Sequence, residues 1–408
     1  MRVIFLNRYF FPDHSATAQI LSDLAFHLSE RGEHVAVITG RQLYDDPGAT
    51  LPRRESLRGV DVHRVSASRF GRHSLIGRGI DYASFYVASA ISVLRVAKRG
   101  DVVVAKTDPP MLSVLVSLLA PLKGYRTVNW LHDVYPEVAG ELGISGLKGR
   151  FGRILARARN ASLSRATMNV AIGEDMARRI CGMGIPRDRM LVVANWTDDE
   201  EIRPSDAAAN PLRREWSLEG KFVVAYSGNL GRAHDIETVL NAAEHLRERS
   251  DIVFLFVGGG RGLRDLEAEA RKRQLESFVF RPYQPRERLS LSLGVADVHW
   301  LSLKAGLDGL LLPSKFYGIA AAGRPMLIIG SPEGEFAKLA AEHACGFAVS
   351  PGNGDELARV IASLAANPVR LQQMGENARR MLDRGLTKSQ ALTRWRAILS
   401  AAAGASTP

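Results

Sequence analysis

The sequence predicts an α/β protein of two domains, each built on a parallel sheet covered by helices. Two stretches, one at the start and one in the second half, repeat the order strand, loop, helix, strand over about thirty residues, the size of a βαβ unit. Their strands are almost continuously apolar, as strands buried on both faces are. The chain has 408 residues, 46% of them hydrophobic and 24% charged, which is enough for two or three domains with ordinary cores.

In the first half, VIFLNRYF predicts a strand and PDHSATA a polar loop. A helix follows, because Leu21, Leu24, Ala25 and Leu28 recur at helical spacing, and VAVIT is the next strand. The runs DVVVAKTD and RTVNWLHD are later strands, and the apolar segment 111–122 is the helix between them.

The second half repeats this order. FVVAYSGNL is a strand, GRAHD a loop, the segment 239–246 a helix and DIVFLFVGGG the next strand. SFVFRPY, DVHWLSL and PMLIIG continue the alternation. We therefore predict two Rossmann-like domains, at 1–200 and 201–385, joined by a linker at 195–211. Residues 386–408 should form a final helix with a frayed tail, SAAAGASTP.

Composition excludes several classes of protein. Cys181 and Cys345 are far apart and match no metal-ligand spacing, so we expect no disulfide framework, no metal site and a reducing compartment. The N-terminus lacks the features of a secretory signal, and no apolar run is long enough to span a membrane.

The net charge of +11 includes an acid-free basic stretch, KGRFGRILARARNASLSRA. As a basic amphipathic helix this stretch suits an anionic membrane surface. It could equally be a solvated helix face. The basic residues are not interleaved with aromatic ones, so we expect no nucleic-acid partner. The predicted membrane-facing residues are Arg150, Arg153 and Arg157.

Ligands of open parallel sheets bind beyond the carboxyl ends of the strands, near helix N-termini. Small, polar and basic residues occupy the corresponding loops of both halves. They would converge on a cleft between the domains, which suits a sugar nucleotide with its diphosphate at a helix N-terminus. The candidates are Ser15, Ala16, Thr17, His132, Asp133, Gly228, Asn229, Arg232, Ser314 and Lys315.

These motifs together resemble those of the family-four retaining glycosyltransferases of the GT-B fold. The likeness covers nearly the whole chain and is carried by FFPDHSATAQILSDLAFHLSERGEHVAVIT, LHDVYPE, VVANWTD, YSGNLGRAHDIETVLNAA, FLFVGGG and LPSKFYGIAAAGRPML. The chain is similar in particular to the branch that builds O-antigen, colanic-acid-like and other bacterial exopolysaccharides. The resemblance implies two Rossmann-like domains facing each other across a cleft, with a C-terminal helix that returns to the N-terminal domain. It makes the first domain acceptor-binding and the second nucleotide-sugar-binding.

The resemblance also implies an activity: transfer of a hexose or N-acetylhexosamine, with retention, from a nucleotide-diphosphate donor. UDP is the first choice of nucleotide and GDP the second, and neither a cofactor nor a metal is expected. A polyprenyl-diphosphate-linked oligosaccharide is the expected acceptor, and the inner face of the cytoplasmic membrane the expected location. His132 matches the histidine that faces the donor sugar, and Asp133 would either orient it or cap a turn.

The sequence departs from the family pattern at the donor site. Asn229 and His234 stand where many members have an arginine and a lysine, which leaves Arg232 and Lys315 to neutralise the diphosphate. Many members also have two glutamates eight residues apart. Those positions hold Leu310 and Gly318 here.

Two further residues complete the predicted donor site. Asp308 could replace a missing carboxylate, and Tyr283 would either stack on the base or fill the rim of the site. Asn195 and Trp196 match the interdomain segment.

Two other functions fit the same pattern. The missing glutamates would suit a catalytically inactive scaffold, and a sugar-nucleotide epimerase can share the two-domain plan. The segment IDYASFYVASAISVL adds an apolar surface that could meet either lipid or a second subunit.

Overall fold

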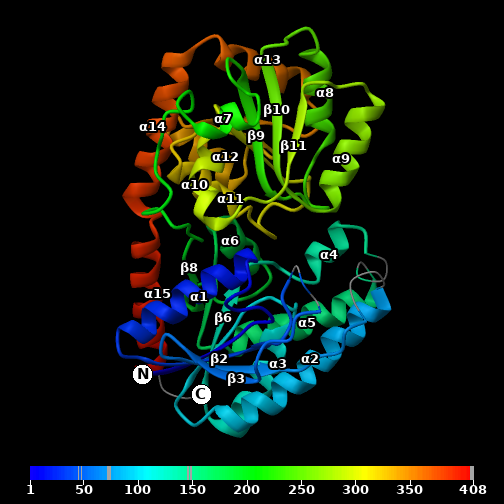
Figure 1. The fold of residues 1–408 in the computed structure, drawn as a ribbon. Coiled ribbons are helices and arrows are strands. Elements are labelled where there is room, and N and C mark those ends of the chain that lie inside the picture. The colour runs from blue at the N-terminus through cyan, green and yellow to red at the C-terminus, as the bar shows by residue number, and fades with distance from the viewer. Residues whose placement is uncertain (45, 47, 71–74, 145–146, 148, 405–408) are drawn as a thin grey trace. The chain divides into compact units, whose positions relative to one another are not determined.

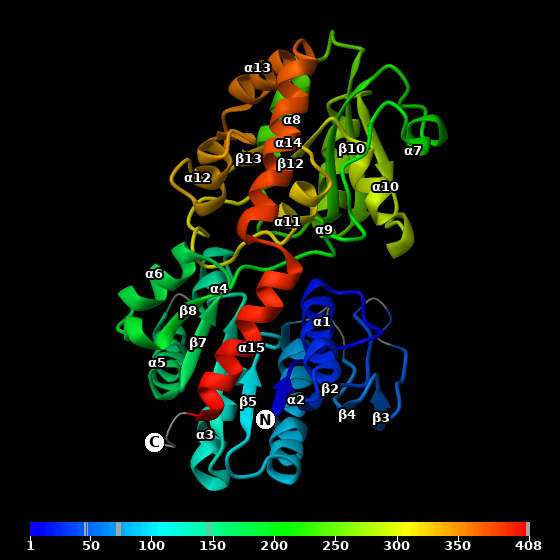
Figure 2. The same cartoon turned by 90° about the vertical axis from the view of Figure 1, so that its left-hand side faces the viewer.

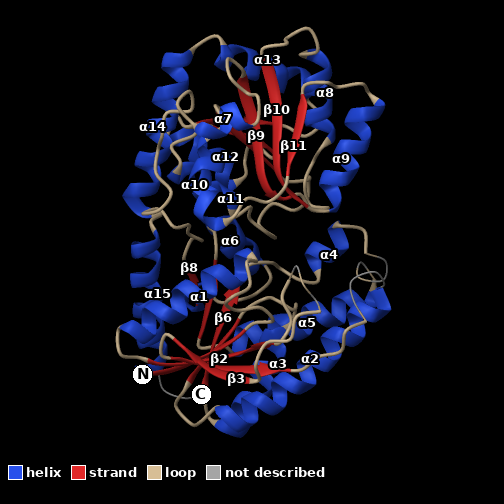
Figure 3. Cartoon of the chain, in the orientation of Figure 1, coloured by secondary structure: helices blue, strands red, loops and turns tan. Residues whose placement is uncertain are grey.

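The computed structural model describes the whole chain except residues 45, 47, 71–74, 145–146, 148 and 405–408. The chain forms two compact units (Figure 1). The first contains Met1–Ala194, the short segment Leu310–Leu312 and the chain from Ser389 onward. The second contains Asn195–Gly309 and Pro313–Lys388. Each unit has one sheet with helices packed against it (Figure 3).

The sheet of the first unit has the strand order β3-β4-β2-β1-β5-β6-β7-β8. All neighbours are parallel except β3 and β4. The predicted apolar runs form its central strands, and Ile4, Leu6, Ile38 and Val103 contribute to its core. The strands are β1 (Arg2–Leu6), β2 (His34–Gly40), β3 (Arg54–Leu57), β4 (Val60–Val65), β5 (Val102–Ala105), β6 (Arg126–Leu131), β7 (Met168–Ala171) and β8 (Met190–Val192).

The antiparallel pair β3–β4 is an element that sequence reasoning missed. A two-residue turn joins the strands, with Arg58 at φ 49° and Gly59 at φ 79°. Positive φ at both central residues gives the twist that a tight hairpin needs. The alternating pattern of Val60–Val65, with its inward valines buried, was the available signal.

The helices of the first unit connect successive strands. Among them, α3 contacts both α2 and α5. The helices are α1 (Ala16–Glu30), α2 (Leu75–Val96), α3 (Leu112–Lys123), α4 (Glu137–Glu141), α5 (Arg150–Arg165), α6 (Glu174–Gly182) and, from the end of the chain, α15 (Lys388–Gly404), with the 3-10 turn η1 (Arg187–Arg189).

The second unit has a fully parallel sheet with the order β11-β10-β9-β12-β13-β14. Its strands are β9 (Phe222–Asn229), β10 (Ile252–Gly259), β11 (Phe278–Arg281), β12 (Val298–Ser302), β13 (Met326–Ile329) and β14 (Gly346–Val349). Its helices are α7 (Pro211–Glu215), α8 (Glu237–His245), α9 (Arg261–Lys272), α10 (Leu289–Gly294), α11 (Lys315–Ala321), α12 (Glu335–Glu342), α13 (Gly354–Ala365) and α14 (Pro368–Gly385), with the 3-10 turn η2 (Arg286–Arg288).

The final helix, α15, belongs to the first unit and lies along its strands (Figure 2). Trp395 is fully buried, and its ring centroid lies 4.3 Å from that of Trp130 on β6. The predicted fraying of the tail is wrong for 400–404, because the helix continues to Gly404 and Ala402 is fully buried. Alanine has the highest helix propensity, and burial of Ala402 further stabilises the last turn of the helix. The rest of the predicted tail, 405–408, lies outside the described residues.

The segment predicted as a linker is anchored to the second unit. Asn195 and Trp196 are buried. A carboxylate oxygen of Asp199 accepts a hydrogen bond from the backbone N–H of Lys388 at 2.8 Å. At the other end, the Asn210 side chain caps α7 by accepting from the N–H of Leu212.

Candidate functional site

His132 lies directly after β6, as the sequence predicts. Its side chain is buried, and its ring centroid lies 5.3 Å from that of Trp130, two residues earlier on the same face of the chain. Burial, and then the positive charge of Lys106, hold the pKa of His132 well below its usual value. The ring is therefore neutral, and its buried Nε2 has no hydrogen-bond partner in the described residues.

Asp133 does not orient His132. No hydrogen bond joins the two side chains within the described part of the chain. The Asp133 backbone instead forms a bridge with Leu311, and the N–H of Val134 donates to the carbonyl of Leu310 at 2.8 Å. Burial and the nearby Asp108 carboxylate raise the pKa of Asp133 to about 7.

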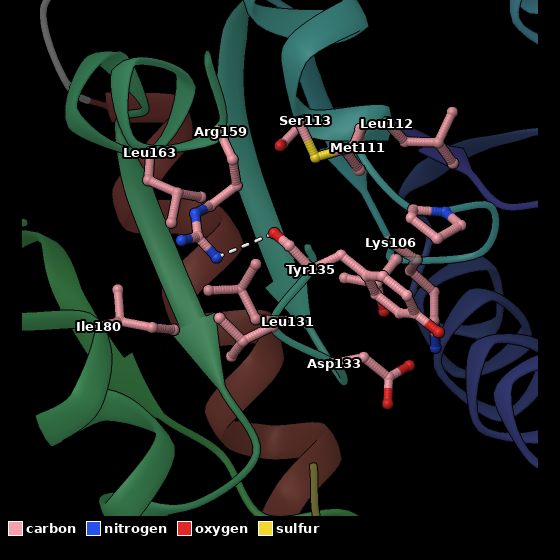
Figure 4. Close-up of a pocket in the computed structure, with 14 residues that line it drawn as sticks. Lys106, Met111, Leu112, Ser113, Leu131, Asp133, Tyr135, Arg159, Leu163 and Ile180 are labelled. Atoms are coloured by element: carbon pink, nitrogen blue, oxygen red, sulfur yellow. Dashed lines mark hydrogen bonds between the residues drawn. The ribbon is translucent and has the colours of Figure 1, made fainter. Parts of the chain in front are cut away.

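A small pocket opens beside Asp133, between the ends of β5 and β6 and the helices α3 and α5 (Figure 4). Two buried cations, Lys106 and Arg159, line it. The Arg159 guanidinium donates to the carbonyl of Tyr135 at 3.0 Å and to Glu137 Oε1 at 2.6 Å. Arg159 therefore fixes the loop after β6.

Sequence reasoning missed Lys106 and placed Arg159 among the basic residues of an exposed helix. The signal for Lys106 was a lysine at the end of an otherwise apolar run, VVVAK. The signal for Arg159 was its helical spacing. Arg159 stands three and four residues before Ser162 and Leu163, so it shares the buried side of α5 with them.

The predicted residues at the start of α1 lie in the same unit as His132. Ser15 is the N-cap residue; its side chain makes no capping bond, and its buried Oγ has no partner among the described residues. Ala16 is exposed. The carbonyl of Thr17 accepts a hydrogen bond from Lys106 Nζ at 3.1 Å.

In the second unit, the end of β9 holds a second cluster, made of Gly228, Asn229 and Lys315. The Lys315 ammonium lies 3.4 Å from the carbonyl oxygen of Asn229 and 5.0 Å from the ring centroid of Tyr226. Gly228 has φ 119°, and a Cβ there would lie 2.7 Å from Cε of Lys315, so glycine makes room for the lysine. Burial lowers the pKa of Lys315 to about 8.

His234 does not replace the missing family cation. Its Nδ1 lies 2.8 Å from the carbonyl of Ser302, which can only accept, so Nδ1 carries the proton. Nε2 lies 3.2 Å from the hydroxyl of Tyr226. Burial, and then Lys315, lower the pKa of His234 to about 4. His234 is thus a neutral link between β9 and β12, and the charge at this strand end comes from Lys315.

The other predicted donor-site residues also belong to the second unit. Arg232 is exposed, Asp308 is half-buried, and Ser314 precedes α11 without a side-chain cap. Tyr283 is 55% exposed, and a Cβ at Gly259 would lie only 3.0 Å from its ring.

The two positions of the missing glutamate pair are buried. Leu310 is fully buried, and a Cβ at Gly318 would lie 3.4 Å from Leu293. A carboxylate at either position would have to be desolvated, which is costly without a partner.

Three neighbouring helices of the first unit expose apolar side chains beside basic ones. The set comprises Ile76, Ile80, Val87, Ile91 and Leu94 of α2, Leu118 and Leu122 of α3, and Phe151 and Ile154 of α5. We call it the apolar helix face. Arg150, Arg153 and Arg157 are exposed on α5, as the sequence predicts.

None of the described helices combines the length and apolarity that crossing a bilayer takes. In the described residues, no cluster of three or more histidine, cysteine, aspartate or glutamate side chains could hold a metal ion.

Both halves of the chain match glycosyltransferase family models. Residues 15–196 match the glycosyl transferase 4-like domain, and residues 210–381 match glycosyl transferases group 1. The protein named probable glycosyltransferase WbjE, of Pseudomonas aeruginosa, is 27% identical over 302 residues, covering 74% of this chain and 75% of its own. WcaI of Escherichia coli strain K12, provisionally named a colanic acid biosynthesis glycosyl transferase, is 27% identical over 351 residues, 83% of this chain and 86% of its own.

Solved structures show the same fold. Alr3699/HepE of Anabaena, crystallised in complex with UDP, superposes with a TM-score of 0.74 at 14% identity, over 98% of this chain and all of its own. WaaG, a glycosyltransferase involved in lipopolysaccharide biosynthesis, gives a TM-score of 0.70 at 17% identity, over 99% of this chain and all of its own. The chain is thus a group 1 glycosyltransferase of the GT-B fold, with a glycosyl transferase 4-like domain in its N-terminal half and a group 1 domain in its C-terminal half.

Proposed function

We propose that the protein transfers a hexose or N-acetylhexosamine, with retention, from a nucleotide-diphosphate donor to a polyprenyl-diphosphate-linked saccharide. UDP is the preferred donor nucleotide, and GDP is the alternative. No metal takes part, and the product enters a cell-surface polysaccharide of the colanic-acid-like class. HepE, whose structure contains UDP, and WcaI, named for colanic acid biosynthesis, support this proposal.

The observation that carries the proposal is the Lys315 ammonium beside Gly228 at the end of β9. Its only hydrogen-bond partner in the described residues is the carbonyl of Asn229, at 3.4 Å. A half-buried cation with so little compensation attracts an anion, and a diphosphate meets that need without a metal. Arg232, exposed in the loop that follows, is available as a second cation.

The test is a thermal-shift screen against UDP, GDP, ADP, CMP and dTDP, with and without magnesium. A ligand that binds only the native state raises the melting temperature by mass action. We expect UDP to give the largest shift and magnesium to leave it unchanged. A shift that requires magnesium would contradict the metal-free proposal, and no shift with any nucleotide would favour an inactive scaffold.

Replacing Lys315 with methionine should weaken UDP binding about tenfold or more, because a charge-assisted hydrogen bond to phosphate is lost. In the wild type, UDP affinity should also fall as the pH rises through about 8, where Lys315 loses its proton. Isothermal titration calorimetry with UDP and with uridine measures both effects.

The pH-dependent fall above pH 8 should be absent from Lys315→Met, and uridine binding should be the same in both proteins. Lys272→Met, which removes an exposed lysine of α9, is the matched control. Equal loss of uridine and UDP binding would assign Lys315 a structural role instead.

We further propose that the protein works at the inner surface of the cytoplasmic membrane, with the apolar helix face against the lipid. This face combines exposed aliphatic and aromatic side chains with the arginines of α5. Apolar burial and attraction to anionic headgroups are the two terms that hold a peripheral protein on a membrane. A lipid-linked acceptor would be presented at the same surface.

Flotation with vesicles containing anionic phospholipid tests this surface. We expect the wild type to float at low salt and a Val87→Asp/Ile91→Asp variant of α2 to stay in solution. Val369→Asp, at an even more exposed valine of α14 in the other unit, should float like the wild type. Absence of wild-type binding at low salt would contradict the proposal.

A further inference from the structure

Lys106 is a buried lysine that the proposed function does not yet use. It follows β5, and only 1% of its surface is exposed. Its ammonium donates to the carbonyl of Thr17, at 3.1 Å, and lies 3.7 Å from the ring centroid of Trp130. Within the described residues, no carboxylate forms an ion pair with it.

Packing alone does not account for a lysine at this position. Burying an ammonium costs free energy that one carbonyl and one aromatic face recover only in part. A methionine would fill nearly the same volume without that cost. Thr17 lies in the first turn of α1, which the hydrogen bond from Lys106 holds against the end of the sheet. Strongly perturbed charged groups of this kind gather at functional sites.

The ammonium acts on His132 through its position over Trp130. The Trp130 ring contacts both groups: its centroid lies 3.7 Å from Lys106 Nζ and 5.3 Å from the centroid of the His132 ring. After burial, Lys106 is the cause that lowers the pKa of His132. Burial also lowers the pKa of Lys106 itself well below its usual value, and the carboxylate of Asp108, which follows β5, opposes that shift. Burial and Asp108 raise the pKa of Asp133, and Arg159 lines the same pocket.

We propose that Lys106 is the positioning residue of His132. Seated on Trp130 and tied to the first turn of α1, its ammonium keeps a second positive charge off the imidazole. Burial and this ammonium together keep His132 neutral, with Nε2 available for a hydrogen bond to the donor sugar. The contact between His132 and the sugar rests on the proposed function, whereas the coupling of Lys106 and His132 is a property of the free protein.

The experiment follows the His132 imidazole by NMR in the full-length protein, labelled with ¹³C at histidine Cε1. His132→Gln identifies the resonance by its loss. In the wild type we expect a titration midpoint well below the ordinary value of about 6.5. In Lys106→Gln the midpoint should rise by about one pH unit or more, because a neighbouring cation has been removed.

The variants separate charge from structure. The glutamine of Lys106→Gln can still donate a hydrogen bond to the Thr17 carbonyl, whereas Lys106→Met removes the charge and the hydrogen bond. Because each variant removes the positive charge, each should raise the titration midpoint of His132. Lys98→Gln, which removes an exposed lysine after α2, should leave it unchanged. A midpoint that stays put in the folded Lys106 variants would overturn the proposal.

If the Lys106 variants do not fold, the titration of the wild-type protein still tests the proposal. A wild-type imidazole that titrates near 6.5 would by itself show that Lys106 does not hold His132 neutral. Neither measurement uses a donor or an acceptor. A failed transfer assay would therefore count against the proposed function and leave the result on Lys106 and His132 intact.

Discussion

Replacing His132 with alanine is expected to lower kcat for sugar transfer about a hundredfold or more. The imidazole is neutral and buried, and its Nε2 has no partner in the described residues, so it is available to a substrate hydroxyl. UDP affinity should stay near the wild-type value, because the diphosphate cation of the proposal, Lys315, lies in the other unit. Steady-state kinetics with the donor that the nucleotide screen identifies measure the first effect, and calorimetry measures the second.

The matched control is His245→Ala, at an exposed histidine at the end of α8. It should transfer sugar at the wild-type rate. Unchanged turnover in a folded His132→Ala protein would remove His132 from the mechanism. If the wild-type enzyme formed a product that still carries its nucleotide and released no free UDP, the protein would be a sugar-nucleotide epimerase rather than a transferase.

Replacing Trp395 with alanine is expected to destabilise the first unit by about 3–5 kcal/mol, the usual cost of truncating a buried tryptophan. Trp395 is fully buried and packs on Trp130, the residue that also contacts His132 and Lys106. Urea unfolding gives the loss of free energy, and hydrogen exchange of the β6 amides assigns it to the first unit.

Arg396→Ala, one residue further along α15, is the control. Arg396 is half-exposed and lies 3.6 Å from Glu33, and such surface ion pairs contribute about 0–1 kcal/mol. If both variants lost the same small amount of stability, the contact between Trp395 and Trp130 would not hold the helix in place.

The sequence was sufficient to predict the strands and the parallel sheets, because apolar runs at regular spacing report burial directly. It also placed His132 and Lys315 at strand ends. It could not show which face of α5 Arg159 occupies or that Lys106 contacts α1. The bond between Lys106 and Thr17 joins residues 89 positions apart, and such partners depend on how distant segments pack. The sequence likewise does not reveal that His234 is neutral, because burial and the nearby Lys315 lower its pKa, and both depend on how distant segments pack.

The contribution of α15 to the first unit bears on the order of events during synthesis. A ribosome delivers the N-terminal half first, and domains commonly fold as they emerge. Here the tryptophan that covers Trp130 is residue 395, so β6 lacks its cover until the second unit has been synthesised. The nascent first half is therefore exposed to chaperones and proteases through the whole production of the second. Synthesis of α15, rather than completion of the first two hundred residues, lets the His132 site assemble.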